Sequence, residues 1–261
     1  MLLLERIPEG RSYVRIACSK SATMRLMLET VQRGSRYWTS GIVALEKAEA
    51  LANKFAALYG TDMPQHTRTR RKAKGLANAT LIMYPQDNQH ITHLLWWLLV
   101  TPGEGLVNTR EQLQDARNKR QRLQWEDQYV LLHKQHSQNT GGGRHWTWEC
   151  TQARYDSLLT GMLALSRGSG NTRSERTDDL ALLIQQIWKM PGFHGVRMQQ
   201  MALIRAGRET WNRTHQAPYG GWPQAAPAYL DKRLPVYHRP TVLRLDQLGK
   251  SGIRKVNRRS V

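Results

Sequence analysis

The sequence predicts an α+β fold, and three patterns carry that prediction. Residues 12–19 alternate apolar and polar side chains as a strand does, and residues 22–32 follow with apolar side chains at helical spacing. Residues 76–84 form a short apolar run that is typical of a buried strand. Residues 123–136 and 145–151 flank a glycine-containing loop and predict a hairpin. Strands and helices are therefore expected in both halves of the chain.

Helices are expected between and after these strands. Residues 41–59 carry apolar side chains three and four positions apart. Residues 91–100 are the most apolar segment, but they have only about half the length of a membrane span, which predicts a core helix. After the hairpin, helical spacing predicts helices at about 152–166, 178–190 and 195–213, the second with Thr177 as its N-cap.

The chain shows no repeat and no long linker, so we expect one body with insertions. Its parts would be an N-terminal part (1–88), a helical insertion (89–122), a hairpin plus helices (123–215) and a C-terminal part (216–261). Short extended runs at residues 233–238 and 241–245, followed by a basic tail, are expected to pack back on the N-terminal part. Residues 109–122 are polar nearly all round, which predicts a charged helix that projects into solvent or lies on a charged partner. A connector is expected at residues 61–75.

The charge balance indicates a polyanionic partner. The 261 residues include 39 Lys and Arg against 20 Asp and Glu, a net charge of +19, and Arg predominates, which favours fork-like hydrogen bonds to phosphate. No segment joins a basic face to a continuous apolar face, so a membrane is not the expected partner. No apolar stretch of signal-peptide length follows Met1, and the two cysteines form no framework, so a cytoplasmic protein is expected.

Four basic clusters are the candidate nucleic-acid-binding residues. They are Arg68, Arg70, Arg71, Lys72 and Lys74; Arg117, Lys119, Arg120 and Arg122; the helix stripe Arg197, Arg205 and Arg208; and a tail cluster at residues 250–259 that includes Lys250, Arg254 and Lys255. Aromatic residues beside Arg, as at Arg36-Tyr37-Trp38, Arg144-His145-Trp146 and Trp211-Asn212-Arg213, can stack unpaired bases and favour RNA. The sequence contains no helix-turn-helix, paired-cysteine finger or leucine zipper that would favour duplex DNA.

No metal or cofactor is expected. His90 and His93 lack a third ligand, and His133 and His136 would point to opposite faces of a strand. Neither glycine-containing loop has the Lys-Ser or Lys-Thr of a phosphate-binding loop, and no paired acids suit two-metal chemistry. RNA cleavage would then use the 2′-hydroxyl as nucleophile, and Arg could stabilise the charged phosphorane but is a poor base.

The opening strand and helix (12–32), the segment RTRRKAKGLANATLIMY and the C-terminal TVLRLDQLGKSGIRK resemble the repeat-associated mysterious protein superfamily. Within it, the chain most resembles the pre-crRNA-processing endoribonuclease of plasmid-borne type IV CRISPR systems. The resemblance implies a ferredoxin-like, RNA-recognition-motif-like sheet with large helical insertions, of which 109–122 would be a charged helical finger on the RNA.

The same resemblance implies a site and partners. Arg25, Arg33, Arg36 and Tyr37 would be the catalytic residues. A monomer would bind the CRISPR repeat hairpin, cleave it without metal to leave a 2′,3′-cyclic phosphate, stay bound to the crRNA and join other CRISPR effector subunits. The alternative from the residues themselves is a non-catalytic, plasmid-encoded RNA- or DNA-binding accessory protein.

Overall fold

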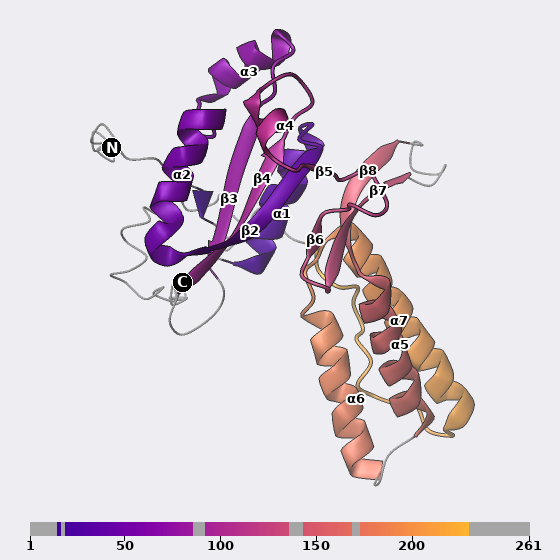
Figure 1. The fold of residues 1–261 in the computed structure, drawn as a ribbon. Helices are drawn as coiled ribbons and strands as arrows, with labels where there is room; N and C mark the ends of the chain where they lie inside the picture. The colour runs from indigo at the N-terminus through magenta and orange to yellow at the C-terminus, as the bar shows by residue number, and fades with distance from the viewer. Residues whose placement is uncertain (1–14, 17–18, 86–91, 136–142, 169–172, 230–261) are drawn as a thin grey trace, which may run out of the picture. The chain divides into compact units, whose positions relative to one another are not determined.

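The computed structural model describes residues 15–16, 19–85, 92–135, 143–168 and 173–229 (Figure 1). The chain divides between Gln121 and Arg122 into two compact units, called here the N-terminal and the C-terminal unit. Each unit contains a sheet and helices, so the predicted α+β class is confirmed. Among the helices of the described ranges, none is long and apolar enough to cross a membrane.

The N-terminal unit contains a five-stranded sheet in the order β1-β3-β4-β2-β5. Its elements are β1 (Arg15–Ile16), α1 (Lys20–Gln32), β2 (Tyr37–Ala44), α2 (Leu45–Tyr59), α3 (Gln65–Ala73), β3 (Ala79–Pro85), β4 (His93–Val100), α4 (Leu106–Arg110) and β5 (Gln114–Asp115). β1 is parallel to β3, and β4 is antiparallel to both β3 and β2. β1, β2 and β3 therefore run in the same direction.

Helices α1 and α2 cover opposite faces of this sheet (Figure 1). The connection through α1 crosses from β1 to β2, and the connection through α2 and α3 returns from β2 to β3. Both crossover connections are expected to be right-handed. The second crossover runs across the sheet in the opposite direction to the first, so its helix lies on the opposite face of the sheet. Ala52 and Phe55 of α2 accordingly pack with Leu81 and Leu98 in one core cluster, and the buried Met27 of α1 lies outside that cluster.

The first four strands of the sheet and the helices between them follow the order β-α-β-α-α-β-β, whereas a ferredoxin-like unit has the order β-α-β-β-α-β. The predicted ferredoxin-like connectivity is therefore not confirmed. Residues 91–100 are expected from the sequence to form a helix, but residues 93–100 form the strand β4, which changes the order of strands and helices. A continuous apolar run fits a buried helix and a fully buried strand equally well. β4 lies between β3 and β2, so a strand satisfies its backbone on both edges.

Other segments of the N-terminal unit also differ from the predictions. The helix expected from residue 41 begins at Leu45, because residues 41–44 complete β2 along β4. Gly41 suits this pairing, since a Cβ there would lie 2.7 Å from Cζ2 of Trp96. The expected connector contains the helix α3, which buries no side chain and so has no apolar stripe to reveal it.

The charged helix predicted for residues 109–122 does not form. α4 ends at Arg110, β5 follows, and turns occupy the next residues. Asp115 and Asn118 accept hydrogen bonds from backbone N–H groups two residues further on, those of Arg117 and Arg120. Such local bonds compete with helix formation.

The C-terminal unit joins a three-stranded antiparallel sheet, in the order β6-β7-β8, to three helices. Its elements are β6 (Gln124–Trp125), β7 (Tyr129–Gln135), β8 (Arg144–Cys150), α5 (Gln152–Arg167), α6 (Arg173–Trp188) and α7 (His194–Thr214). The predicted hairpin and the three predicted helices are confirmed. Thr177 is not the N-cap of α6, because that helix begins one turn earlier.

Residues 215–229 pack on α7 within the C-terminal unit. Trp211 Nε1 donates to the carbonyl of Ala217 at 2.9 Å, and Arg197 Nε donates to that of Pro227 at 2.6 Å. The first residues of the predicted C-terminal part therefore belong to this unit. The expected strands at 233–238 and 241–245, and the tail with Lys250, Arg254 and Lys255, lie outside the described residues.

Candidate nucleic-acid interface

The register of the N-terminal sheet aligns one end of four strands. Ala79 of β3 pairs with Val100 of β4, Val100 pairs with Tyr37 of β2, and Tyr37 pairs with Asp115 of β5. Three basic segments that are far apart in the sequence lie just beyond this row: the turn 33–36 before β2, the segment from α3 to β3, and the turn 116–121 after β5. Antiparallel pairing therefore gathers them at a single end of the sheet.

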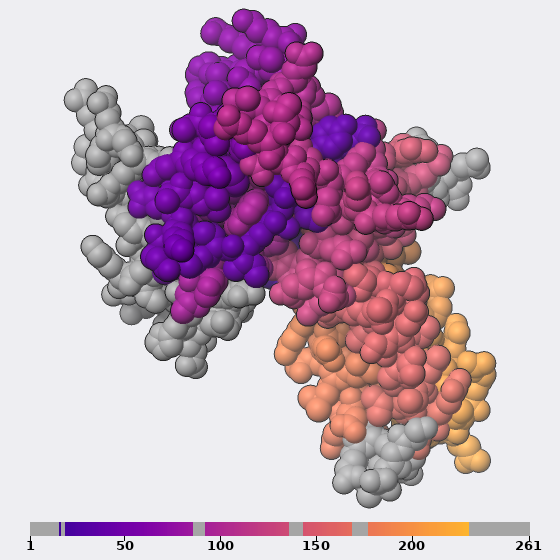
Figure 2. All heavy atoms as spheres, in the orientation of Figure 1, coloured from indigo at the N-terminus to yellow at the C-terminus, as the bar shows by residue number. Residues whose placement is uncertain are grey.

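Direct contacts confirm that these segments adjoin. A Cβ on Gly34 would lie 3.8 Å from Nζ of Lys72 in α3. The carbonyl of Arg36 accepts the backbone N–H of Ala116 at 3.0 Å. Figure 2 shows indigo atoms of the early chain and magenta atoms of later segments on one surface of the unit. We call the cations here the basic end; they are Arg33, Arg36, Arg70, Lys72, Lys74, Arg117, Lys119 and Arg120, all exposed except the half-buried Arg36.

Acidic groups near the basic end neutralise only part of its charge. Asp115 forms an ion pair with Arg36. Glu111 accepts the hydroxyl of Tyr59, and burial raises the pKa of that tyrosine to about 12. Glu104 is exposed. Among the described residues, no ion pair joins Arg70 or Lys72 of α3, or Lys74 at its C-cap, to a carboxylate.

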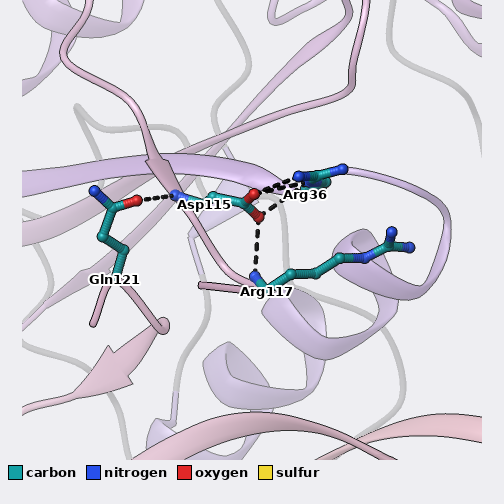
Figure 3. A network of polar contacts seen from close by, with 4 residues as sticks. All are labelled: Arg36, Asp115, Arg117 and Gln121. Atoms are coloured by element: carbon teal, nitrogen blue, oxygen red, sulfur yellow. Dashed lines mark hydrogen bonds and ion pairs between the residues drawn. The ribbon is translucent and has the colours of Figure 1, made fainter. Parts of the chain in front are cut away.

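The turn after β5 is held in place by its own hydrogen bonds (Figure 3). Asp115 accepts the backbone N–H of Arg117 at 2.9 Å and donates its own N–H to Oε1 of Gln121 at 3.1 Å. Gln121 N–H donates to the carbonyl of Asn118, and Trp38 Nε1 donates to the carbonyl of Gln121 at 2.9 Å. A turn fixed in this way loses little further conformational freedom when a ligand binds its exposed cations.

Arg36 is fixed between Asp115 and Tyr37. Its Nε lies 3.0 Å from both carboxylate oxygens of Asp115, and Nη2 donates to Oδ2. Its guanidinium carbon lies 5.2 Å from the centre of the Tyr37 ring. The hydrogen bond from Arg36 holds the pKa of Asp115 below its ordinary value, and the same bond raises the pKa of Arg36. Both groups therefore stay charged near neutral pH.

The structure brings together three of the four predicted catalytic residues. Arg33, Arg36 and Tyr37 lie at the start of β2, and the Tyr37 ring packs against the core cluster of α2. Arg25 lies on α1, about 12 Å along the helix axis from Arg33. It pairs with Glu29 at 2.8 Å, and Arg33 lies 3.7 Å from the same carboxylate but remains 72% exposed.

The predicted RNA-binding residues fall into different environments. Arg68 donates to the carbonyls of Thr61, Met63 and Ala79 and to the hydroxyl of Thr80, so it is committed to the fold. Arg71 donates to the carbonyl of Ala77 and is half-buried. Arg122 is half-buried at the start of the C-terminal unit, and Arg144 is exposed on β8.

The predicted arginine stripe on α7 does not form. Arg197 is buried and lies 3.2 Å from the centre of the Tyr229 ring, so only Arg205 and Arg208 remain exposed. Helical spacing placed Arg197 on the same face, but residues 215–229 cover that part of the helix. The three tryptophans proposed for base stacking are also packed inside: Trp38, Trp146 and Trp211 are each less than 10% exposed.

Sequence reasoning missed the part played by Asp115 and Gln121. The spacing of Asp115 and Asn118 is a signal for a turn that could have revealed this loop. The partner of the Asp115 carboxylate, Arg36, is 79 residues away and is not visible from local sequence.

The chain is therefore an α+β protein that carries a preformed cationic surface at the basic end. No protein-family model, curated protein or solved structure matches the chain. The described residues contain no group of three or more His, Cys, Asp or Glu that could hold a metal ion.

Proposed function

We propose that this protein binds RNA through the basic end of its N-terminal sheet. The observation that carries the proposal is the aligned row Ala79, Val100, Tyr37 and Asp115, beyond which three basic segments meet. Cations held on ordered turns bind the phosphate backbone with a smaller entropic cost than cations on mobile chains.

The RNA surface in this proposal is an end of the sheet and not one of its faces. A ferredoxin-like RNA-binding domain stacks bases on an open sheet face. Here α1 and α2 lie on opposite faces, and Trp38 is only 7% exposed. Phosphate contacts from arginine and lysine therefore supply most of the affinity, and that affinity falls steeply with salt.

The test compares a labelled RNA hairpin with a DNA duplex of the same sequence over a range of salt concentrations. Lys119→Gln/Arg120→Gln should weaken RNA binding about tenfold and reduce the slope of log affinity against log salt by about 1.5. The matched control is Lys47→Gln/Lys54→Gln, which removes the same charge from exposed positions of α2. Equal effects of the two double variants would show that net charge, and not the basic end, carries binding.

The resemblance of the sequence supports a narrower form of the proposal, a metal-independent endoribonuclease that processes CRISPR repeat RNA and retains the crRNA. Arg33 and Arg36 are placed to stabilise the charge of a phosphorane formed when a 2′-hydroxyl attacks its own phosphate. In this form a cytoplasmic monomer binds one repeat hairpin and carries the crRNA to other effector subunits. The observation that favours it is the position of Arg33, Arg36 and Tyr37 at the basic end.

Cleavage is tested separately from binding. Repeat RNA incubated with the protein in EDTA should be cut once, and a 2′-deoxy substitution at the cut nucleotide should abolish cleavage while binding persists. Arg36→Ala should reduce cleavage far more than it reduces affinity, for which a loss of about tenfold is expected. If the 2′-deoxy RNA is still cut, the cyclisation mechanism is wrong. If neither RNA is cut and duplex DNA binds equally well, the protein is a nucleic-acid-binding accessory factor.

A further inference from the structure

Arg36 still has hydrogen-bond donors to offer a ligand. A guanidinium carries five N–H groups in a planar fork. Asp115 occupies the Nε edge and one Nη2 position, and the side chain remains 36% exposed. The edge that includes Nη1 is therefore available, and the Tyr37 ring restricts the plane in which it lies.

The same carboxylate also orders a second arginine. Asp115 Oδ1 accepts the backbone N–H of Arg117 at 2.9 Å, and the Arg117 side chain is exposed. Figure 3 shows the guanidinium groups of Arg36 and Arg117 on one side of Asp115, whereas Gln121 lies on the other side. One acidic residue thus sets the position of one guanidinium directly and of another through the backbone.

We propose that Asp115 is a positioning residue that organises Arg36 and Arg117 into a two-armed binding site for one phosphodiester group of the RNA backbone. This inference rests on the proposed RNA-binding function and identifies the point at which the backbone is held. Arg is suited to the role because its fork matches two phosphate oxygens at once.

Because Asp115 is acidic, the direction in which RNA affinity changes on its replacement tests the proposal. If Asp115 acted only through its charge, it would repel phosphate, and its removal would strengthen RNA binding. If it positions Arg36, its removal frees that side chain to adopt many rotamers and weakens binding, although the protein gains positive charge. Charge and positioning therefore predict opposite effects of the same substitution.

The experiment measures the binding of the labelled RNA hairpin to full-length Asp115→Asn and to the control Glu104→Gln. Asparagine keeps an oxygen for the Arg117 N–H but loses the ion pair with Arg36. We expect Asp115→Asn to bind about tenfold more weakly, which corresponds to about 1.4 kcal/mol, with a salt slope lower by about 0.8. Glu104 is exposed at the same end of the sheet, so Glu104→Gln should bind as tightly as the wild type or more tightly.

A second variant guards against an altered fold. Arg36→Lys retains the positive charge and leaves Asp115 in place, but it cannot form the fork. We expect the same loss of affinity and of salt slope as for Asp115→Asn, with thermal unfolding unchanged within about 2 °C. Wild-type affinity in either variant, or tighter binding by Asp115→Asn, overturns the positioning role while RNA binding stands. Failure of the wild-type protein to bind the hairpin refutes the proposed function itself.

Discussion

Arg68 should stabilise the N-terminal unit and contribute nothing to RNA affinity, although it lies in the most basic segment of the chain. Its guanidinium donates to four oxygens in two segments, the turn 61–63 and the start of β3. Each bond contributes about 1 kcal/mol at a half-buried position, so Arg68→Ala should lower the free energy of unfolding by about 2–4 kcal/mol. That loss corresponds to a fall of about 10 °C in Tm.

Two variants separate geometry from charge. Arg68→Lys keeps the charge, but a compact ammonium cannot reach four separate acceptors, so most of the loss in Tm should remain. Arg70→Ala is the matched control, because Arg70 is exposed on the same helix. It should leave Tm within about 2 °C of the wild type and lower the salt slope of RNA binding by about 0.8.

The assays are thermal unfolding by circular dichroism and RNA titration at a temperature where every variant is folded. Arg68→Ala should melt early and, while folded, bind RNA with the wild-type salt slope. The reasoning is refuted if Arg68→Ala melts like the wild type and loses RNA affinity to the same extent as Arg70→Ala.

Three further results are expected. The hydrogen bond from Arg36 lowers the pKa of Asp115 in the folded state, so the stabilisation by this pair is present above about pH 4 and is lost as the pH falls through the lowered pKa. The difference in Tm between the wild type and Asp115→Asn should therefore shrink in acid. A difference in Tm that does not change with pH would contradict this expectation. Burial raises the pKa of the Cys150 thiol to about 11, so in a Cys18→Ser background a maleimide at pH 8 should label the protein only on unfolding, and rapid labelling of the folded protein would show that the thiol is accessible. Gly195→Ala should destabilise the C-terminal unit by about 2–4 kcal/mol, since its Cβ would lie 2.6 Å from the carbonyl oxygen of Trp148; a wild-type thermal melt would mean that α7 shifts freely on β8.

Local sequence patterns correctly predicted the helices and strands in which the spacing of apolar residues matches the face that is buried in the fold. Residues 22–32 and 195–213 are amphipathic and form α1 and α7, and residues 129–135 pair with residues 144–150 as the predicted hairpin. The same patterns could not separate helix from strand at residues 91–100, where the seven residues 94–100 are all apolar. β4 is a strand because β2 and β3 are available on both of its edges.

Tertiary contacts also decide which arginines are committed to the fold and which are exposed. Arg68 and Arg70 are alike in sequence, yet Arg68 is bound to carbonyls across the turn and strand, and Arg70 faces solvent. Arg197 matched the helical spacing of Arg205, but a later segment of the chain covers it.

The sequence by itself determined that this protein is an α+β chain with a large excess of arginine, because composition and periodicity are properties of the chain alone. Only the tertiary structure decided which of those arginines form a surface. The antiparallel register places Tyr37 beside both Val100 and Asp115, and through it three distant segments meet. Their approach depends on the order of the strands, which no local pattern encodes, and an acidic residue, Asp115, holds one of the arginines that they bring together.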